Sequence, residues 1–262
     1  MSNATHQFDA IILGGGIAGL WLLSLLRNQG FEAILLEKEG LGSGQTFASQ
    51  GMIHGGVKYS LAGAMTGASE SIADMPSRWR SCLEGTDSVN LKGVSVLSDA
   101  YYMFSDARLS SKLTAFFASK AIEGRVTSVP ASDYPEVFQS PSFGGVLYKL
   151  KDLVLDTNSL ITHLHNQFKD YIFEGNVMFE HTNGRVTHLQ LDSGLTLSAE
   201  TYVLAAGKGN GDLIFDLGLQ VPMQLRPLHQ VVVKGKNLPD LFAHAVALRF
   251  SDKPRITFTT HT

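Results

Sequence analysis

Cysteine is almost absent from this chain. Its 262 residues include one cysteine, Cys82. An intrachain disulfide needs two cysteines and a cysteine-based metal site needs several, so the chain alone forms neither. Metal-ligand spacing with carboxylates is also lacking at the histidines 163, 165, 181, 188 and 229. We therefore expect no metal site, and the lone thiol fits a reducing compartment.

An excess of charge of one sign is lacking too. The chain has 21 Lys and Arg against 24 Asp and Glu, a net charge of −3. Nothing here favours nucleic acid or an anionic membrane as a partner. The apolar stretch Ala10–Leu26 contains three consecutive glycines, follows Asp9 rather than Lys or Arg, and is shorter than a bilayer span. We expect no membrane span and no signal peptide, and a cytoplasmic protein.

Glycine, in contrast, is abundant and placed at a telling position. The apolar run Phe8–Leu13 leads directly into Gly14, Gly16 and Gly19, and the apolar segment Leu20–Leu26 follows. This is the G-x-G-x-x-G spacing of a strand, a tight turn and a helix that bind a dinucleotide. The first glycine allows the turn, the second lets a pyrophosphate approach the backbone, and the third lets the helix pack closely.

An acidic residue completes this unit. The apolar run Ala33–Leu36 ends at Glu37, twenty-three positions after Gly14. A carboxylate there can accept hydrogen bonds from both ribose hydroxyls and would repel a 2′-phosphate, which disfavours NADP. Because strand, helix, Gly30 and carboxylate are all in register, we predict that a dinucleotide binds here. The alternative is a glycine-rich turn in some other α/β protein.

A second stretch rich in glycine and small hydroxyls runs over residues 40–59. Backbone N–H groups and hydroxyls suit a diphosphate and an isoalloxazine ring. The alternative is a flexible surface loop, but the apolar pair Met52-Ile53 and the aromatic Tyr59 favour a packed one.

These motifs resemble the FAD-dependent oxidoreductases of the D-amino-acid oxidase and glycerol-3-phosphate dehydrogenase superfamily. The second stretch, GSGQTFASQGMIHGGVKY, is most similar to the glycerol-3-phosphate and 2-hydroxyglutarate dehydrogenase branches in its part Ile53, His54, Gly55, Gly56 and Tyr59. The segments TYVLAAGKGN (201–210) and RPLHQVVVKG (226–235) look like later motifs of the same family, in the same order.

The glycine motif and the resemblance together predict FAD as the cofactor and give its binding residues. They are Gly14, Gly16, Ile17, Ala18, Gly19, Glu37, Lys38, Ser43, Gly44, Thr46, Ser49, Gln50, Gly51, Met52, Val177, Ala205, Ala206 and Gly207.

His54 is the candidate catalytic residue. The resemblance places it by the flavin ring, as a base, an electrostatic partner or a covalent attachment point. The alternative is a hydrogen-bonded structural histidine. Lys58, Arg226 and Arg249 are candidate anchors for an anionic substrate, although isolated cations more often serve solubility or ion pairs.

Periodicity and turn signals predict further elements along the chain. We expect helices at 62–83 (kinked or divided at Pro76), 110–121, 157–168 and 211–219, and strands at 94–104, 144–155, 171–180, 185–191, 195–198, 201–204, 229–234, 243–250 and 255–260. The expected fold class is α/β. It comprises a Rossmann-like FAD-binding domain with a three-stranded β-meander (1–74 and 151–219), and an α+β substrate domain with a mainly antiparallel sheet (75–150 and 220–262).

The function that we expect is oxidation of a small hydroxy acid, amino acid or polyol phosphate, with FAD taking the hydride. An NAD-dependent dehydrogenase is disfavoured, because its first βαβ unit is not usually followed by a stretch like residues 42–56. Family members continue past the position of Thr262, so we expect the substrate domain to be incomplete. The alternative is a truncated, non-catalytic protein that binds FAD or ADP weakly. The oligomeric state is not predicted.

Overall fold

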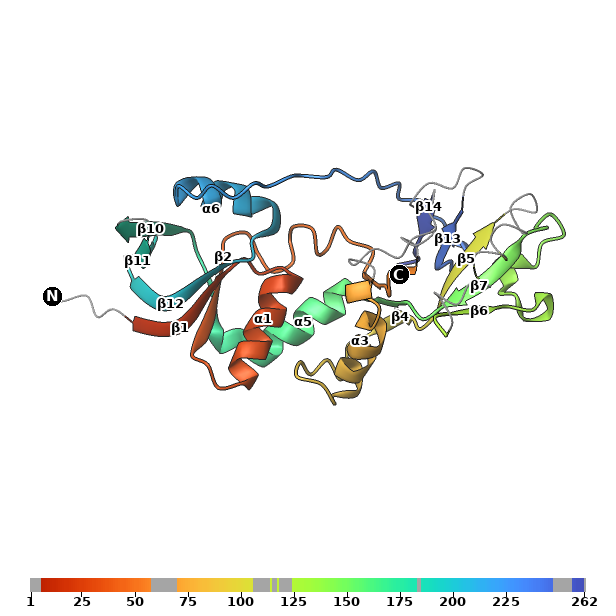
Figure 1. Cartoon of the computed structure of the whole chain (residues 1–262), viewed down its shortest axis with the longest axis horizontal. Helices are drawn as coiled ribbons and strands as arrows, with labels where there is room; N and C mark the ends of the chain where they lie inside the picture. The colour runs from red at the N-terminus through yellow and green to blue at the C-terminus, as the bar shows by residue number, and fades with distance from the viewer. Residues whose placement is uncertain are drawn as a thin grey trace. The chain divides into compact units, whose positions relative to one another are not determined.

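The computed structural model describes residues 6–57, 70–105, 114, 117, 124–182, 185–246 and 256–261 (Figure 1). The chain forms two compact units. The first comprises residues 1–49, 84–94 and 157–230, and the second comprises residues 50–83, 95–156 and 231–262. Residues 50–74, which the sequence assigns to the FAD-binding domain, lie in the second unit. The limits of the functional domains stay a prediction.

The first unit is built on a six-stranded sheet. Its strands, in order across the sheet, are β10 (Val177–Thr182), β11 (Arg185–Leu191), β12 (Thr196–Leu204), β1 (His6–Leu13), β2 (Ala33–Glu37) and β9 (Ile172–Glu174). β1 is parallel to both of its neighbours, β12 and β2, whereas β10, β11 and β12 pair antiparallel. This is the Rossmann-like sheet with a three-stranded meander that the sequence predicts.

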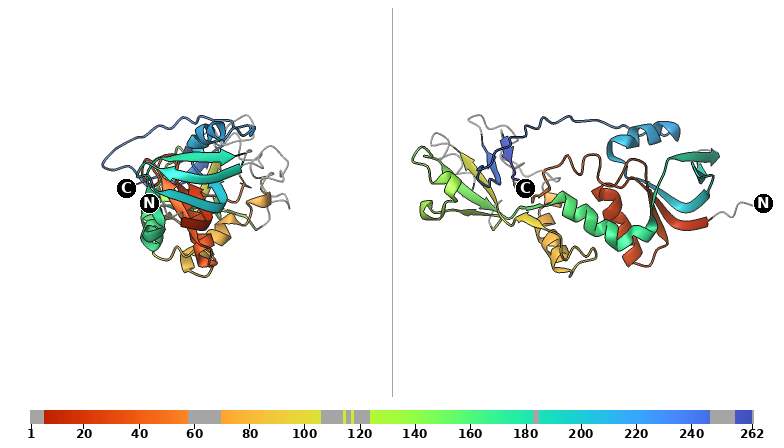
Figure 2. Two further views of the ribbon diagram at one scale, coloured as in Figure 1. Left: turned by 90° about the vertical axis from the view of Figure 1, so that its left-hand side faces the viewer. Right: turned by 180° about the vertical axis from the view of Figure 1, so that it is seen from behind.

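The two faces of this sheet are buried because side chains alternate along each strand. Ile11 and Leu13 lie in one cluster with Leu189, Leu191 and Leu197 of the meander. The opposite face is covered by α1 (Ile17–Asn28), which packs on α5 (Thr157–Phe168). Figure 2 shows these two helices next to each other from behind.

The meander differs in detail from the expectation. The predicted single run 171–180 is divided at Gly175, whose φ of 153° suits glycine. β9 therefore joins the parallel part of the sheet beside β2, and β10 starts the meander. The predicted strands 195–198 and 201–204 are one strand, β12, which pairs with β11 and with β1. The predicted turn at 183–184 lies outside the described residues.

The second unit has two sheets. The larger contains, in order, β14 (Ile256–Phe258), β13 (Ala243–Ala245), β5 (Tyr101–Ser105), β7 (Val146–Leu150) and β6 (Val126–Ser128), and the smaller contains β3 (Met52–Ile53), β8 (Leu153–Leu155) and β4 (Val96–Ser98). All their pairings are antiparallel except β13 with β5, as the expected mainly antiparallel sheet requires. Tyr101, Met103, Leu150 and Val154 form the centre of a shared core.

Proline marks a helix start in this unit. The helix expected at 62–83 is described from residue 70 onward, and α3 runs over Met75–Glu84. Pro76 is its second residue, where a helix does not need the missing N–H, so the chain is divided there rather than kinked. Cys82 on α3 is fully buried. Most of the helix expected at 110–121 lies outside the described residues.

One predicted strand is wrong. Residues 219–242, which include the expected strand 229–234, contain no helix or strand. Val231 and Val232 are 86% and 76% exposed. A run of β-branched residues becomes a strand only where a neighbouring backbone accepts and donates its hydrogen bonds, and the described sheets provide no such neighbour. The last two predicted strands are confirmed as β13 and β14, each of three residues.

Candidate functional site

The carboxyl ends of three strands meet at the glycine turn of the first unit. The Gly14 N–H donates to the Leu36 carbonyl (2.9 Å), and the Ala205 N–H donates to the Leu13 carbonyl (2.8 Å). β1 lies between β2 and β12, so the chain order reverses at this strand. In open α/β sheets, ligands bind outside the carboxyl ends of the strands at such a reversal.

Gly14 and Gly19 are glycines because no side chain fits. Gly14 has φ of 116°, and a Cβ there would lie 2.6 Å from the Cα and N of Ala206. A Cβ on Gly19 would overlap the carbonyl oxygen of Gly14. Gly14 therefore lets the turn approach the end of β12, while Gly19 lets α1 start directly against the turn. The structure supports the role that the sequence gives to each.

The N-terminus of α1 is shaped for an anion. Its N-cap, Gly16, has no side chain, and the first turn has no acidic residue. The Ile17 N–H donates to Oγ1 of Thr46 (3.0 Å), a buried residue of the loop after β2. Ala18 is exposed. Free N–H groups and the helix dipole favour negative charge at this end of a helix.

Glu37 binds the glycine turn as well as standing at the end of β2. Its Oε2 accepts a hydrogen bond from the Gly15 N–H (2.5 Å), and its Oε1 accepts from the N–H groups of Lys38 (2.9 Å) and Glu39 (2.8 Å). A carboxylate has about four acceptor positions, so capacity for a ribose hydroxyl remains. Lys38 is exposed, with its amino group 3.5 Å from Glu39. The sequence argument missed Gly15, although it stands inside the glycine motif.

The loop after β2 folds back onto the glycine turn. The Gly42 N–H donates to the Gly15 carbonyl (2.9 Å), and the Ser49 hydroxyl donates to the Thr46 carbonyl (2.8 Å). Ser43 and Gly44 lie exposed between these two contacts. The predicted residues of this loop are therefore held near the start of α1.

The segment after β12 is fixed by a residue that sequence reasoning missed. Oδ1 of Asn210 accepts a hydrogen bond from the Ala206 N–H (2.8 Å), and its amide donates to the Leu204 carbonyl (3.1 Å). Gly207, with φ of 55°, completes the turn. The signal was present, because an asparagine after a small-residue turn often binds its own backbone. Val177, the first residue of β10, lies half-buried in the sheet core, paired with Leu191.

Four of the predicted residues belong to the second unit. Gln50 donates its amide hydrogens to the Thr257 carbonyl (3.3 Å) and to Oγ1 of Thr259 (3.1 Å). The Gly51 carbonyl accepts from the Leu155 N–H (2.9 Å). Met52 packs on the core of this unit, and His54 follows β3, half-buried. A role for these residues at a flavin stays a prediction.

The candidate anion anchors are less informative. Lys58, Tyr59 and Arg249 lie outside the described residues. Arg226 is exposed, and its guanidinium donates to the side chain of Gln224 (3.4 Å). In the described part of the chain, no three His, Cys, Asp or Glu side chains are grouped to hold a metal ion. No helix within those residues is long and apolar enough to span a membrane.

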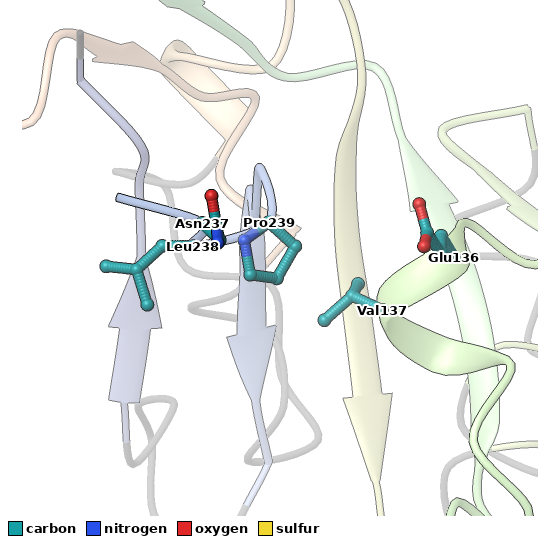
Figure 3. A pocket seen from close by; sticks show the side chains of 5 residues that line it. All are labelled: Glu136, Val137, Asn237, Leu238 and Pro239. Carbon is teal, nitrogen blue, oxygen red and sulfur yellow. The ribbon is translucent and has the colours of Figure 1, made fainter. Parts of the chain in front are cut away.

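A shallow pocket of about 420 Å³ opens on the surface of the second unit. It is lined by Glu136 and Val137 of the short helix η4 (Glu136–Phe138) and by Asn237, Leu238 and Pro239. Figure 3 shows Val137 directed toward Pro239. None of the predicted site residues lines this pocket, and we assign it no ligand.

Comparison with known proteins gives one family. The model of the family DAO, FAD-dependent oxidoreductases, matches residues 9–261. The probable FAD-dependent oxidoreductase PA4991 of Pseudomonas aeruginosa is 45% identical over 254 residues, which are 97% of this chain and 64% of that protein. The chain therefore spans somewhat less than two thirds of the length of that relative.

Structures agree with this match. The crystal structure of PA4991 superposes with a TM-score of 0.80 at 39% identity, covering 98% of this chain and 63% of that one. L-proline dehydrogenase from P. horikoshii has a TM-score of 0.69 at 16% identity, over 92% and 65% of the two chains, which shows a common fold. The mitochondrial glycerol-3-phosphate dehydrogenase of Saccharomyces cerevisiae is 44% identical over 55 residues, 21% of this chain and 8% of that protein.

Proposed function

The chain belongs to the DAO family of FAD-dependent oxidoreductases, and from this premise we propose that its first unit holds the ADP part of FAD. The observation that carries the proposal is the glycine turn, where the space of a Cβ at Gly14 is taken by the backbone of Ala206 and that at Gly19 by the carbonyl of Gly14. Such a turn keeps the start of α1 free of side chains, as close approach of a pyrophosphate requires.

Each group around the turn has a role in this proposal. The N–H groups at the start of α1 bind the pyrophosphate, and the exposed Ser43 and Gly44 lie in the loop beside it. Glu37 accepts from the ribose hydroxyls with the acceptor capacity that its three N–H contacts leave. Its negative charge disfavours a dinucleotide that carries a 2′-phosphate.

His54 is the residue that we assign to the reacting side of the cofactor. FAD, when bound, accepts a hydride from a carbon beside a hydroxyl or amino group. His54 then acts as a base, as an electrostatic partner or as the point of covalent attachment. The support is its place directly after β3, in a turn rich in glycine, together with the family of the chain.

The substrate class remains the broad one given by the sequence: a small hydroxy acid, an amino acid or a polyol phosphate. Local identity to a glycerol-3-phosphate dehydrogenase over 55 residues supports the last of these. Because the chain spans 64% of its relative PA4991, turnover by this chain is itself part of the proposal. A cytoplasmic location also stays a proposal, supported by the single cysteine.

An absorption spectrum tests the proposal. The purified chain, after incubation with FAD and desalting, is expected to show the flavin bands in the visible range. Acid precipitation then separates two forms of attachment: flavin in the supernatant is non-covalent, whereas flavin in the pellet is covalent and makes His54 the first residue to mutate. A colourless protein that takes up no FAD would contradict the proposal and favour the non-catalytic alternative.

A further inference from the structure

The turn that carries His54 is closed by a buried carboxylate. Asp152 is 2% exposed, and its Oδ1 accepts a hydrogen bond from the Gly55 N–H over 3.0 Å. Gly55 directly follows His54 and is itself buried. A buried aspartate is rare unless its charge is matched by strong donors, because desolvation of a carboxylate is costly.

Strand pairing brings these residues together. β3 and β8 pair antiparallel, with Met52 opposite Val154 and Ile53 opposite Leu153. Continued by one residue, this register places Asp152 opposite His54. The carboxylate therefore meets the backbone at the point where the chain leaves β3, although the two partners of the bond are 97 positions apart in sequence.

Both sides of the turn are fixed from α3. A Cβ on Gly55 would lie 3.1 Å from the Ala73 carbonyl oxygen and 3.5 Å from Cγ of Pro76, so the turn is tightly packed against the start of that helix. From the same helix, Nη1 of Arg80 donates to the Lys151 carbonyl over 2.8 Å. This second contact holds the residue that precedes Asp152.

The negative charge of Asp152 also acts on another residue of this core. Burial of the Tyr101 hydroxyl raises its pKa, and the nearby charge of Asp152 raises it further. The hydroxyl donates to the Phe258 carbonyl over 2.5 Å. The region around the turn is thus a buried, ordered environment in which the position of one carboxylate is well defined.

We propose that Asp152 is the positioning residue of His54, and that its carboxylate fixes the His54–Gly55 turn through the Gly55 N–H. The consequence for a flavin rests on the proposed function, which assigns His54 to the reacting side of FAD. The positioning itself concerns the protein without cofactor, so the two are tested separately.

The first test follows the imidazole of His54 in the protein without FAD. The nine histidines are labelled with ¹³C at Cε1, and the His54→Gln variant identifies the His54 signal. Spectra are recorded at pH 8.5, where an ordinary imidazole is neutral. Asp152→Ala is expected to move the His54 signal by more than its line width. Asp152→Asn, which keeps an acceptor oxygen, is expected to leave it close to its original position.

The matched control is Asp9→Asn. Asp9 of the first unit also accepts a backbone N–H, that of Glu32, over 2.7 Å, and its loss is expected to leave the His54 signal unmoved. An unmoved His54 signal in Asp152→Ala, or an equal movement in Asp9→Asn, would overturn the proposal. If Asp152→Ala does not fold, Asp152→Ser, whose shorter side chain cannot reach the Gly55 N–H, takes its place.

The second test uses the flavin spectrum. Asp152→Ala is expected to change the absorption bands of bound FAD in the same direction as His54→Gln, while ADP affinity stays within twofold of the original chain. Asp152→Asn is expected to restore the original bands. An original spectrum in Asp152→Ala would contradict the link to the flavin. If the original chain binds no FAD, the proposed function fails, whereas the histidine signals still decide the positioning role.

Discussion

The two glycine-containing turns of this protein solve opposite problems. The turn after β1 leads into α1 with a side-chain-free N-cap and no acid in the first helical turn, so its N–H groups suit an incoming anion. The turn after β3 receives a buried carboxylate of the protein itself, which accepts the Gly55 N–H. One turn offers donors to a ligand, whereas the other uses a donor to fix a neighbouring side chain.

The difference lies in where the negative charge comes from. At Gly14–Gly19 the protein keeps acidic side chains away from the helix end, and Glu37 binds the Gly15 N–H from the end of the next strand. At Gly55 the charge is built in and buried with Asp152. Glycine content alone therefore does not indicate a phosphate site. The distribution of charge around the exposed N–H groups does.

The largest effect is expected at the packed glycine of the first turn. Gly19→Ala places a Cβ on the Gly14 carbonyl, and overpacking of this kind costs about 3 kcal/mol. We expect lower stability in chemical denaturation and loss of FAD binding. Gly211→Ala is the matched control, because it also lies in a helix of the first unit and its Cβ would meet only Met223, at 3.8 Å. Equal stability of the two variants would contradict this reading of the turn.

The next effect concerns the carboxylate at the end of β2. Glu37→Gln removes the charge that binds the Gly15 N–H, and hydrogen bonds to charged groups are worth about 1.5–3 kcal/mol. We expect ADP affinity, measured by calorimetry, to fall at least roughly tenfold. Glu39→Gln, two positions further on and exposed, is expected to leave that affinity unchanged. A similar loss in both variants would point to net charge instead of a specific site.

A smaller effect is expected for the cap of α1. Thr46→Val removes the acceptor of the Ile17 N–H, and loss of an N-cap costs about 1 kcal/mol. Thr46→Ser keeps the hydroxyl and is expected to retain most of the stability in the same denaturation experiment. If the serine variant is as unstable as the valine variant, packing of the methyl group rather than capping explains the loss.

The smallest effect concerns the surroundings of the second turn. Tyr101→Phe removes the donor to the Phe258 carbonyl and is expected to cost about 0.5–1 kcal/mol at pH 8. Because the pKa of Tyr101 is raised in the folded protein, its neutral form stabilises folding fully below the unfolded pKa of about 10, and this contribution falls as the pH rises above that value. The difference between the two proteins should therefore shrink above pH 10. A constant difference in denaturation across this range would contradict the burial argument.

The nucleotide-binding turn was predictable because its signals are local. Gly14, Gly19 and Glu37 are read from spacing within one βαβ unit, and the structure places all three as that spacing implies. The meander followed from alternating runs and turn residues. Its register did not, since β12 is one strand with two kinds of partner.

What the sequence could not show depends on distant partners. The run at 229–234 has the composition of a strand, but its valines are exposed because no described strand lies beside them. Asp152 looked like an ordinary turn residue, and its role follows only from a bond to Gly55, 97 positions away. Thr46 likewise caps a helix that begins 29 positions earlier. Such contacts are decided by the folded chain, not by any window of sequence.

Competition between cofactor fragments tests the central claim most directly. If the first unit holds the ADP part of FAD through its glycine turn, ADP binds the chain and is displaced by FAD, whereas FMN does not displace it. Gly211→Ala should behave like the original chain, and Glu37→Gln should weaken ADP and FAD alike. A chain that binds FMN but not ADP would contradict the claim, because its flavin would then be held without the glycine turn.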